Sequence, residues 1–211
     1  MGRVSNGRAD EKSPDRLIAL SDGIFAIAMT LLVLDIHVAA GLDADGFRDA
    51  VRDSLPALGA YALSFTILAA LWREHRRILR LARRVDGLSL RLALAGLGAI
   101  ALVPFPTTML SEYASQPLAV AVYASTICVI DLLELAVFLT IWRRPHMSHP
   151  ISDRVARNIL TDLGTTVLVF AATVPIAFVS PTAALWTWLS LVPIKIALGR
   201  REQSRAGPDT R

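Results

Sequence analysis

The chain has 211 residues, of which 54% are hydrophobic and 19% charged, and its formal net charge is +4. Soluble domains usually carry about 25% charged residues, so this composition argues against a soluble protein and favours one embedded in lipid. The basic surplus does not indicate nucleic acid, because its residues lie between apolar runs rather than on one water-exposed face. Cys128, the single cysteine, excludes an intrachain disulfide and a cysteine-based zinc site.

Six apolar stretches follow one another along the chain, separated by polar segments. They cover residues 17–40, 55–72, 88–110, 117–142, 159–179 and 182–198. Each has roughly 17 to 26 residues, the length that an α-helix needs to cross about 30 Å of hydrocarbon. The sequence therefore predicts an all-α integral membrane protein with six transmembrane helices. We expect a tail at residues 1–16, a transmembrane domain at 17–199 and a basic tail at 200–211.

The distribution of arginine predicts the orientation. Basic residues crowd both tails and the segments after the second and fourth stretches, whereas the segments 111–116 and 180–181 carry none. By the positive-inside rule, both termini lie in the cytoplasm and the number of spans is even. The arginines that follow Trp72 are expected to contact anionic lipid headgroups of the cell membrane.

The first stretch opens with residues that are unusual in a membrane span. Ser21, Asp22 and Gly23 place a carboxylate and a flexible backbone near its start. A carboxylate exposed to lipid is costly, so we expect Asp22 to face protein or water, with Arg16 as a partner only through bending or from another chain. Alternatively, Asp22 caps the helix by accepting backbone N–H bonds. The residues alone leave both interpretations open.

An apolar stripe continues along the same helix. Ile27, Leu31 and Leu34 recur at i, i+4 and i+7, with Gly23 before Ile27 and Thr30 beside Leu31. Taken alone, such a stripe is typical of ordinary packing in a membrane bundle. Four copies around an axis would instead form stacked apolar rings that close a pore by dewetting, and the Thr30 hydroxyl would offer oxygen to a partly dehydrated cation.

Three other carboxylates in the apolar stretches have candidate roles. Asp35 either concentrates cations at a pore mouth or is simply solvated. Asp131 and Glu134 are three residues apart on one face of the fourth helix, where a carboxylate must be protonated or paired, with His75 or an arginine as partner. They predict either structural hydrogen bonds or a proton relay. A proton-conducting or proton-coupled transporter using Asp131 and Glu134 is therefore the alternative function, although its usual internal repeats and paired broken helices are not evident.

Several short motifs point to one family. They are Arg16, Ser21-Asp22-Gly23, Phe25-Ala26-Ile27-Ala28 and Thr30-Leu31-Leu32-Val33-Leu34 at and in the first stretch, Trp72 and His75 at the end of the second, and Pro104-Phe105-Pro106-Thr107 in the third. This set resembles the signature of the TMEM175 family of bacterial and lysosomal potassium channels, with weaker likeness at Tyr123 and 175–186. Leu20, Glu74 and Arg76 depart from the family's usual aromatic residue, Asn and second His.

The resemblance implies a potassium-selective cation channel of modest selectivity rather than an enzyme. The first helices of a homotetramer would line a central pore, with the constriction at Ile27 and the lining at Thr30, Leu31 and Leu34. The structural polar network behind it would comprise Arg16, Ser21, Asp22, Gly23, Trp72 and His75. The implied partners are further copies of the chain, membrane lipids and permeating potassium ions. No cofactor and no resident metal is implied, and no nucleophile, base and electrostatic stabiliser converge as an enzyme would need.

Overall fold

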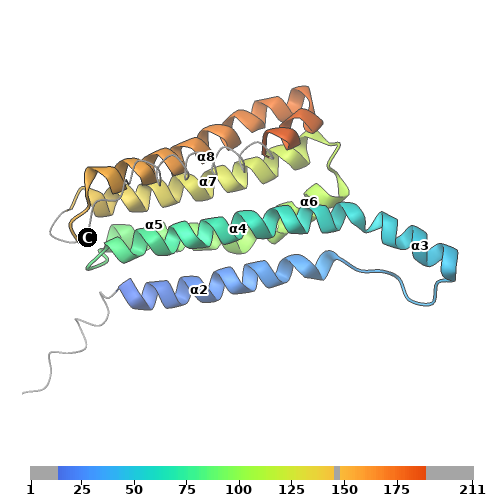
Figure 1. Ribbon diagram of the computed structural model, residues 1–211, viewed down its shortest axis with the longest axis horizontal. Coiled ribbons are helices and arrows are strands. Elements are labelled where there is room, and N and C mark those ends of the chain that lie inside the picture. Colours follow the sequence, from blue (N-terminus) through green and yellow to red (C-terminus); the bar gives the residue numbers. More distant parts are fainter. Residues whose placement is uncertain (1–13, 145–147, 189–211) are drawn as a thin grey trace, which may run out of the picture.

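The computed structural model describes residues 14–144 and 148–188. Within these ranges the chain is a bundle of long helices, with one isolated β-bridge between Ala82 and Ser148. Figure 1 shows the helices lying side by side along one direction, with α3 reaching beyond the bundle. The elements are α2 (Pro14–Leu31), the 3-10 turn η1 (Leu32–Asp35), α3 (Ala44–Asp53), α4 (Leu55–Leu81), α5 (Gly87–Leu102), α6 (Pro104–Glu112), α7 (Pro117–Trp142) and α8 (Asp153–Val179).

Five stretches of the described residues are long and apolar enough to cross a membrane. They are Pro14–Leu34, Ala44–Leu81, Gly87–Glu112, Pro117–Trp142 and Asp153–Val179. These confirm the all-α, multi-pass prediction and match the first five apolar stretches of the sequence. The sixth predicted span, 182–198, is described as helix only as far as Trp188, and its remainder lies outside the described residues together with the predicted tail 200–211.

Two segments expected as loops are helical. The first is α3, where Asp43 caps the helix start by accepting a hydrogen bond from the Gly46 backbone N–H at 2.8 Å. The second is the basic segment after Trp72, because α4 continues to Leu81 before the chain turns. Hydropathy falls at Arg73, but arginine and leucine are good helix formers, so the helix outlasts the apolar run.

The third span is broken at Val103, between α5 and α6. Pro104 and Pro106 lack a backbone N–H, so the carbonyls one turn earlier lose their usual helical donors. The Val103 N–H instead bonds the Ile100 carbonyl at 3.1 Å, which tightens the turn. The prolines therefore interrupt the helix as the sequence indicates.

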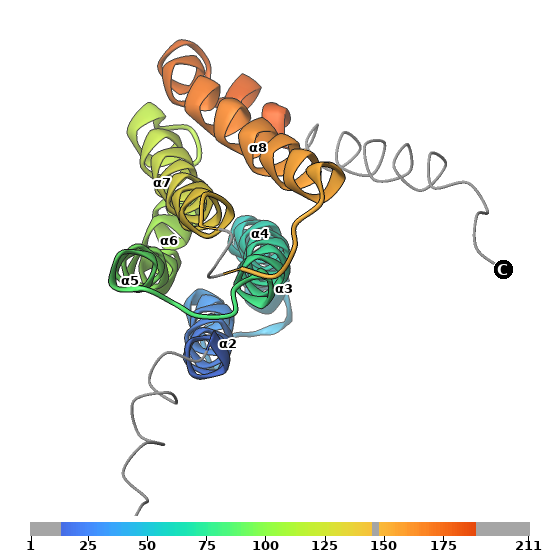
Figure 2. The same cartoon turned by 90° about the vertical axis from the view of Figure 1, so that its left-hand side faces the viewer.

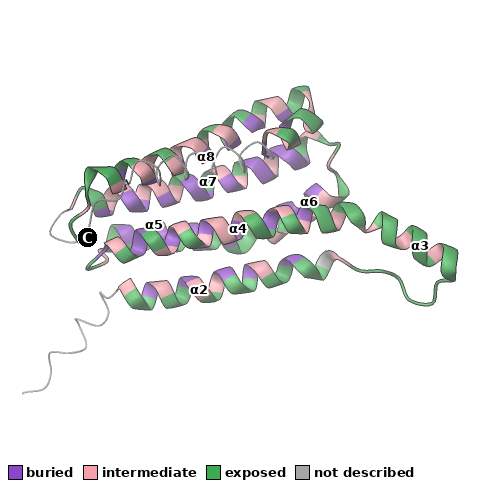
Figure 3. Ribbon diagram, in the orientation of Figure 1, coloured by how far each residue is buried: buried purple, intermediate pink, exposed green. Residues whose placement is uncertain are grey.

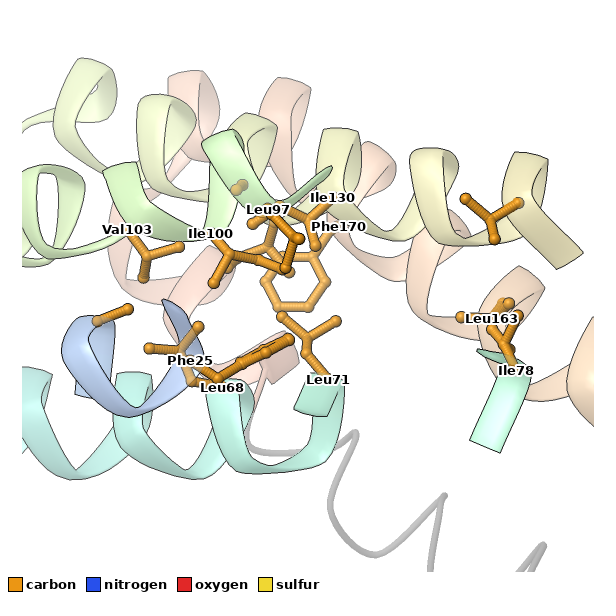
Figure 4. Packing of buried hydrophobic residues seen from close by; sticks show 14 of the residues in the cluster. Phe25, Leu68, Leu71, Ile78, Leu97, Ile100, Val103, Ile130, Leu163 and Phe170 are labelled. Atoms are coloured by element: carbon orange, nitrogen blue, oxygen red, sulfur yellow. The ribbon is translucent and has the colours of Figure 1, made fainter. Parts of the chain in front are cut away.

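The bundle packs in layers around α4, α5 and α7. α2 lies against α4 and α5 on one side, and α8 lies against α7 on the other, as Figures 1 and 2 show. Figure 4 shows the buried interior, to which Phe25 of α2, Leu68 of α4 and Ile100 of α5 contribute. Lipid tails are as apolar as these side chains, so close packing and interhelical hydrogen bonds, rather than exclusion of water, hold the helices together.

Candidate ion pathway and the polar network behind it

One face of α2 is packed against the bundle and the other is open. The packed face carries Leu17, Ser21, Phe25 and Ala28 and continues at Leu32, the first residue of η1. All five are buried and are spaced three or four residues apart. This spacing keeps one side of the helix against α4 and α5 along its whole length. Figure 3 shows the exposed positions along α2 in green.

The apolar stripe predicted from the sequence lies on the open face. Ile27 is 59% exposed, Leu31 is 40% exposed and Leu34 is 68% exposed, although each is an apolar side chain. Leu34 stands on the 3-10 turn η1 rather than on the α-helix, so the stripe ends in a tighter turn than expected. Three large apolar side chains in a row therefore remain uncovered within the single chain.

Small and polar residues interrupt this open face. Thr30 is exposed, and its hydroxyl donates to the backbone carbonyls of Ala26 and Ile27 at 3.0 and 2.9 Å. Because the proton is directed at the helix, the lone pairs of the oxygen stay available to a cation. A Cβ on Gly23 would meet nothing within 4 Å, so Gly23 also lies in open space. The side chain of Asp35, the predicted pore mouth, lies outside the described residues.

Behind this face, three buried polar residues join α2, α4 and α7. Ser21 Oγ lies 2.8 Å from His75 Nε2, and His75 Nδ1 lies 2.6 Å from Glu134 Oε1. Ser21 and His75 are fully buried, and Glu134 is 2% exposed. The ring of Phe25 packs against His75 with centroids 5.7 Å apart. The structure thus brings together Ser21 and His75 and adds Glu134, which the sequence had placed on α7 as a candidate partner of His75.

The hydrogen bonds of Ser21 determine how many protons His75 and Glu134 share. Ser21 Oγ donates its only proton to the Leu17 carbonyl at 2.7 Å, so His75 Nε2 must be the donor towards Ser21. One proton then remains between His75 Nδ1 and Glu134 Oε1. Whether nitrogen or oxygen holds it, the pair carries no net charge, which lowers the cost of placing it among apolar helices.

A second polar contact lies beside the first. Trp72 Nε1 donates to Asp22 Oδ1 at 2.7 Å, and an Arg76 guanidinium nitrogen lies 3.7 Å from Asp22 Oδ2. The same guanidinium stands over the Trp72 ring, 5.3 Å from its centroid. Asp22 therefore faces protein rather than lipid. Arg16 is exposed, and within the described chain no hydrogen bond or ion pair links it to this group.

Asp131 has different surroundings from Glu134, although one helical turn separates them. Asp131 is 2% exposed and lines a cavity of about 240 Å³ between α4, α7 and α8, which Asp162 and Thr166 also line. Glu134 instead faces α4 at His75. The two carboxylates of α7 thus face different parts of the bundle. In the part of the chain that the structure describes, no three His, Cys, Asp or Glu side chains form a group able to hold a metal ion.

Sequence reasoning missed a chain of buried hydroxyls in the other half of the bundle. Thr107 Oγ1 donates to Ser64 Oγ at 2.9 Å, and Ser64 Oγ lies 2.9 Å from the Tyr123 hydroxyl. These bonds connect α6, α4 and α7. The signal was the presence of three hydroxyl side chains inside apolar stretches, since a buried hydroxyl in lipid needs a partner.

The sequence is similar to those of known channel proteins. The sequence profile of the family described as "Endosomal/lysosomal potassium channel TMEM175" matches residues 16–104, which include most of α2 and all of α4. A protein of Streptomyces collinus named a potassium channel is 34% identical over 180 residues, covering 81% of this chain and 85% of the relative.

More distant relatives include vertebrate proteins. A Danio rerio protein named endosomal/lysosomal proton channel TMEM175 is 21% identical over 145 residues, which are 68% of this chain but only 28% of the relative.

A solved structure has the same fold. The crystal structure of a lysosomal potassium-selective channel TMEM175 homolog from Chamaesiphon minutus matches with a TM-score of 0.76 at 25% identity, covering 88% of this chain and 97% of that one. The chain therefore belongs to the TMEM175 family.

Proposed function

We propose that this chain forms a potassium-selective cation channel that conducts ions passively across the cell membrane. The observation that carries the proposal is the uncovered stripe of Ile27, Leu31 and Leu34 on α2. The names of the bacterial relative and of the Chamaesiphon structure, a potassium channel and a potassium-selective channel, support the same function. The transmembrane domain, residues 17–199, would be the conducting unit and would have no enzymatic activity or cofactor.

Four copies related by a symmetry axis would turn the open face of α2 inward. Closed rotational symmetry buries the same face in every copy, so one stripe per chain becomes a set of stacked rings. An apolar stripe could equally face lipid, but Gly23 and Thr30 on the same open face favour a pore. Glycine allows close approach of helices. A hydroxyl oxygen makes no favourable contact with acyl chains but can coordinate a cation.

In this arrangement Ile27 forms the narrowest ring and Thr30, Leu31 and Leu34 line the pore beyond it. Water held between apolar walls makes too few hydrogen bonds, so the ring empties and an ion meets an uncompensated desolvation cost. Potassium sheds its hydration shell more readily than sodium, which gives modest selectivity. Asp35 would attract cations at the outer mouth. The polar residues Ser21, Asp22, Trp72 and His75 would hold α2 in place.

Proton conduction is the second candidate. The His75–Glu134 bridge holds a single proton between two buried atoms, and the Danio rerio relative is named a proton channel. Such a bridge supports relay only if it gains and loses protons during conduction. Flux of potassium and of protons can be measured separately in the same vesicles, with potassium-selective electrodes and an internal pH dye.

Substitution of Ile27 tests the channel mechanism. In liposomes loaded with potassium, Ile27→Asn should wet the ring, raise basal potassium efflux about tenfold or more, and reduce discrimination against sodium. The matched control is Leu32→Val, which lies on the packed face at 2% exposure and should cost only about 1 kcal/mol of packing. If Ile27→Asn leaves both conductance and selectivity unchanged in assembled protein, α2 does not line the conduction path.

A further inference from the structure

A basic pocket lies where α4 and α7 end and α8 begins. Its walls are Arg83, Trp142, Ser148, His149, Pro150 and Ile151, and it has a volume of about 320 Å³. The membrane-capable stretches end at Leu81 and Trp142 and resume at Asp153, so the pocket lies at the level where the hydrocarbon meets water. Figure 2 looks onto this end of the bundle.

Backbone contacts build the pocket. The His149 N–H donates to the Leu81 carbonyl at 2.8 Å, and Ala82 and Ser148 form an antiparallel bridge. These contacts fasten the segment before α8 to the end of α4. Nearby, Arg144 pairs with Asp86, which joins the end of α7 to the start of α5. The pocket is therefore formed by secondary-structure contacts and not by flexible side chains alone.

The pocket presents positive charge that has no carboxylate partner within the described chain. Arg83 Nε donates to His149 Nδ1 at 3.4 Å, and no ion pair to Arg83 exists among the described residues. Asp86, the acidic residue nearest in sequence, is already paired with Arg144. The terminal nitrogens of Arg83 are consequently available to an anion, and planar guanidinium groups bind phosphate oxygens in a bidentate manner.

Part of the pocket lining is apolar. The Trp142 ring stacks on Phe138 with centroids 6.0 Å apart and is 37% exposed, and Pro150 and Ile151 extend this surface. A pocket at the membrane boundary that is lined by both a cation and apolar groups matches a phosphate group attached to acyl chains. Tryptophan is enriched at the depth of the lipid headgroups because its ring also combines an apolar body with a polar N–H group.

We propose that this pocket binds the phosphate of an anionic phospholipid, with Arg83 as the main donor and Trp142 against the start of an acyl chain. This binding does not depend on ion conduction. The proposed site differs from general attraction of arginine to a membrane surface, because only Arg83 among several neighbouring arginines would bind the phosphate in the pocket.

Fluorescence quenching of Trp142 tests the proposal. The full chain is placed in nanodiscs of phosphatidylcholine with one tenth of phosphatidylglycerol, brominated near the headgroup end of one lipid or the other. The Trp142→Phe variant supplies the signal of the other tryptophans for subtraction. Brominated phosphatidylglycerol should be enriched at Trp142 by more than about fivefold relative to brominated phosphatidylcholine, because about fivefold is the preference expected for one cation at a membrane surface without a formed site.

The matched variants are Arg83→Gln and Arg84→Gln, neighbouring exposed arginines of which only the first lines the pocket. Arg83→Gln should remove the preference, Arg83→Lys should keep part of it, and Arg84→Gln should keep nearly all of it. An equal loss in Arg83→Gln and Arg84→Gln would overturn the site, since it would indicate unspecific surface attraction. Loss of the preference on addition of millimolar glycerol phosphate to the wild-type protein would show that the pocket binds the phosphate group without needing the acyl chains, which would overturn the role assigned to Trp142.

Discussion

Replacing Glu134 with leucine removes the acceptor on which the buried His75 depends. The Glu134 side chain is 2% exposed and its Oε1 lies 2.6 Å from His75 Nδ1, while His75 itself is fully buried. Leucine fills a similar volume but accepts no hydrogen bond. His75 must then keep its bond to Ser21 through Nε2 and leave Nδ1 without a partner among apolar side chains.

The expected cost follows from that single unpaired nitrogen. A buried polar atom that loses its partner destabilises a protein by about 1–3 kcal/mol. Glu134→Gln should cost less than about 1 kcal/mol, because its amide N–H can donate to a neutral Nδ1 while Nε2 still donates to Ser21. Glu134→Leu therefore removes the hydrogen bond to His75, whereas Glu134→Gln keeps a hydrogen bond but removes the shared proton.

The assay is thermal unfolding of the purified protein in detergent, followed by tryptophan fluorescence. Glu134→Leu should lower the midpoint by several degrees, and Glu134→Gln by much less. Adding His75→Phe to Glu134→Leu should cost less than the sum of the two single changes, because both polar groups are then gone. If the costs are additive, or if Glu134→Leu is as stable as the wild type, the two side chains do not interact as the distance indicates.

Two further outcomes are expected from the proposed pore and from the proposed orientation. Thr30→Ala should preserve the Ile27 constriction but lower the ratio of potassium to sodium flux by about two- to tenfold, because it removes only the oxygen; an unchanged ratio in reconstituted protein would contradict a role for Thr30 in selectivity. Peptide tags at residue 1 and residue 211 should be protected in intact cells, whereas a tag in the 111–116 segment should be labelled from outside; labelling of either terminus would contradict the positive-inside assignment.

The sequence predicts the spans well because lipid imposes a simple requirement. A span needs about 20 apolar residues with every backbone group bonded internally, and five such stretches recur where the composition indicates. The break at Val103 also follows from sequence, since Pro104 lacks the donor that a continuous helix requires. What hydropathy could not show was α3, which is polar and depends on the cap at Asp43.

The polar contacts are less accessible to sequence reasoning. Ser21, Asp22, Trp72 and His75 were grouped by family resemblance, and no periodicity says which of them touch. His75 and Glu134 are 59 residues apart, and only the packing of α4 against α7 brings them to 2.6 Å. Arg16 belongs to the same motif but is exposed and, within the described chain, makes no hydrogen bond or ion pair with the other members.

The bonds of Ser21 and Asp22 to α4 have a mechanical consequence for α2. Ser21 and Asp22 lie in the N-terminal half of α2, whereas the rest of its packed face is apolar. Apolar contacts can slide, but two directed bonds on adjacent residues resist translation and rotation, so the easiest displacement of α2 is a pivot about this end. At a rise of 1.5 Å per residue, Ile27 lies about 9 Å from the pivot and Leu34 about 19 Å. A swing of about 10° would move Ile27 by about 1.5 Å and Leu34 by about 3 Å. In the proposed pore, the ring at Leu34 would therefore widen first and Ile27, nearer the pivot, would remain the last constriction.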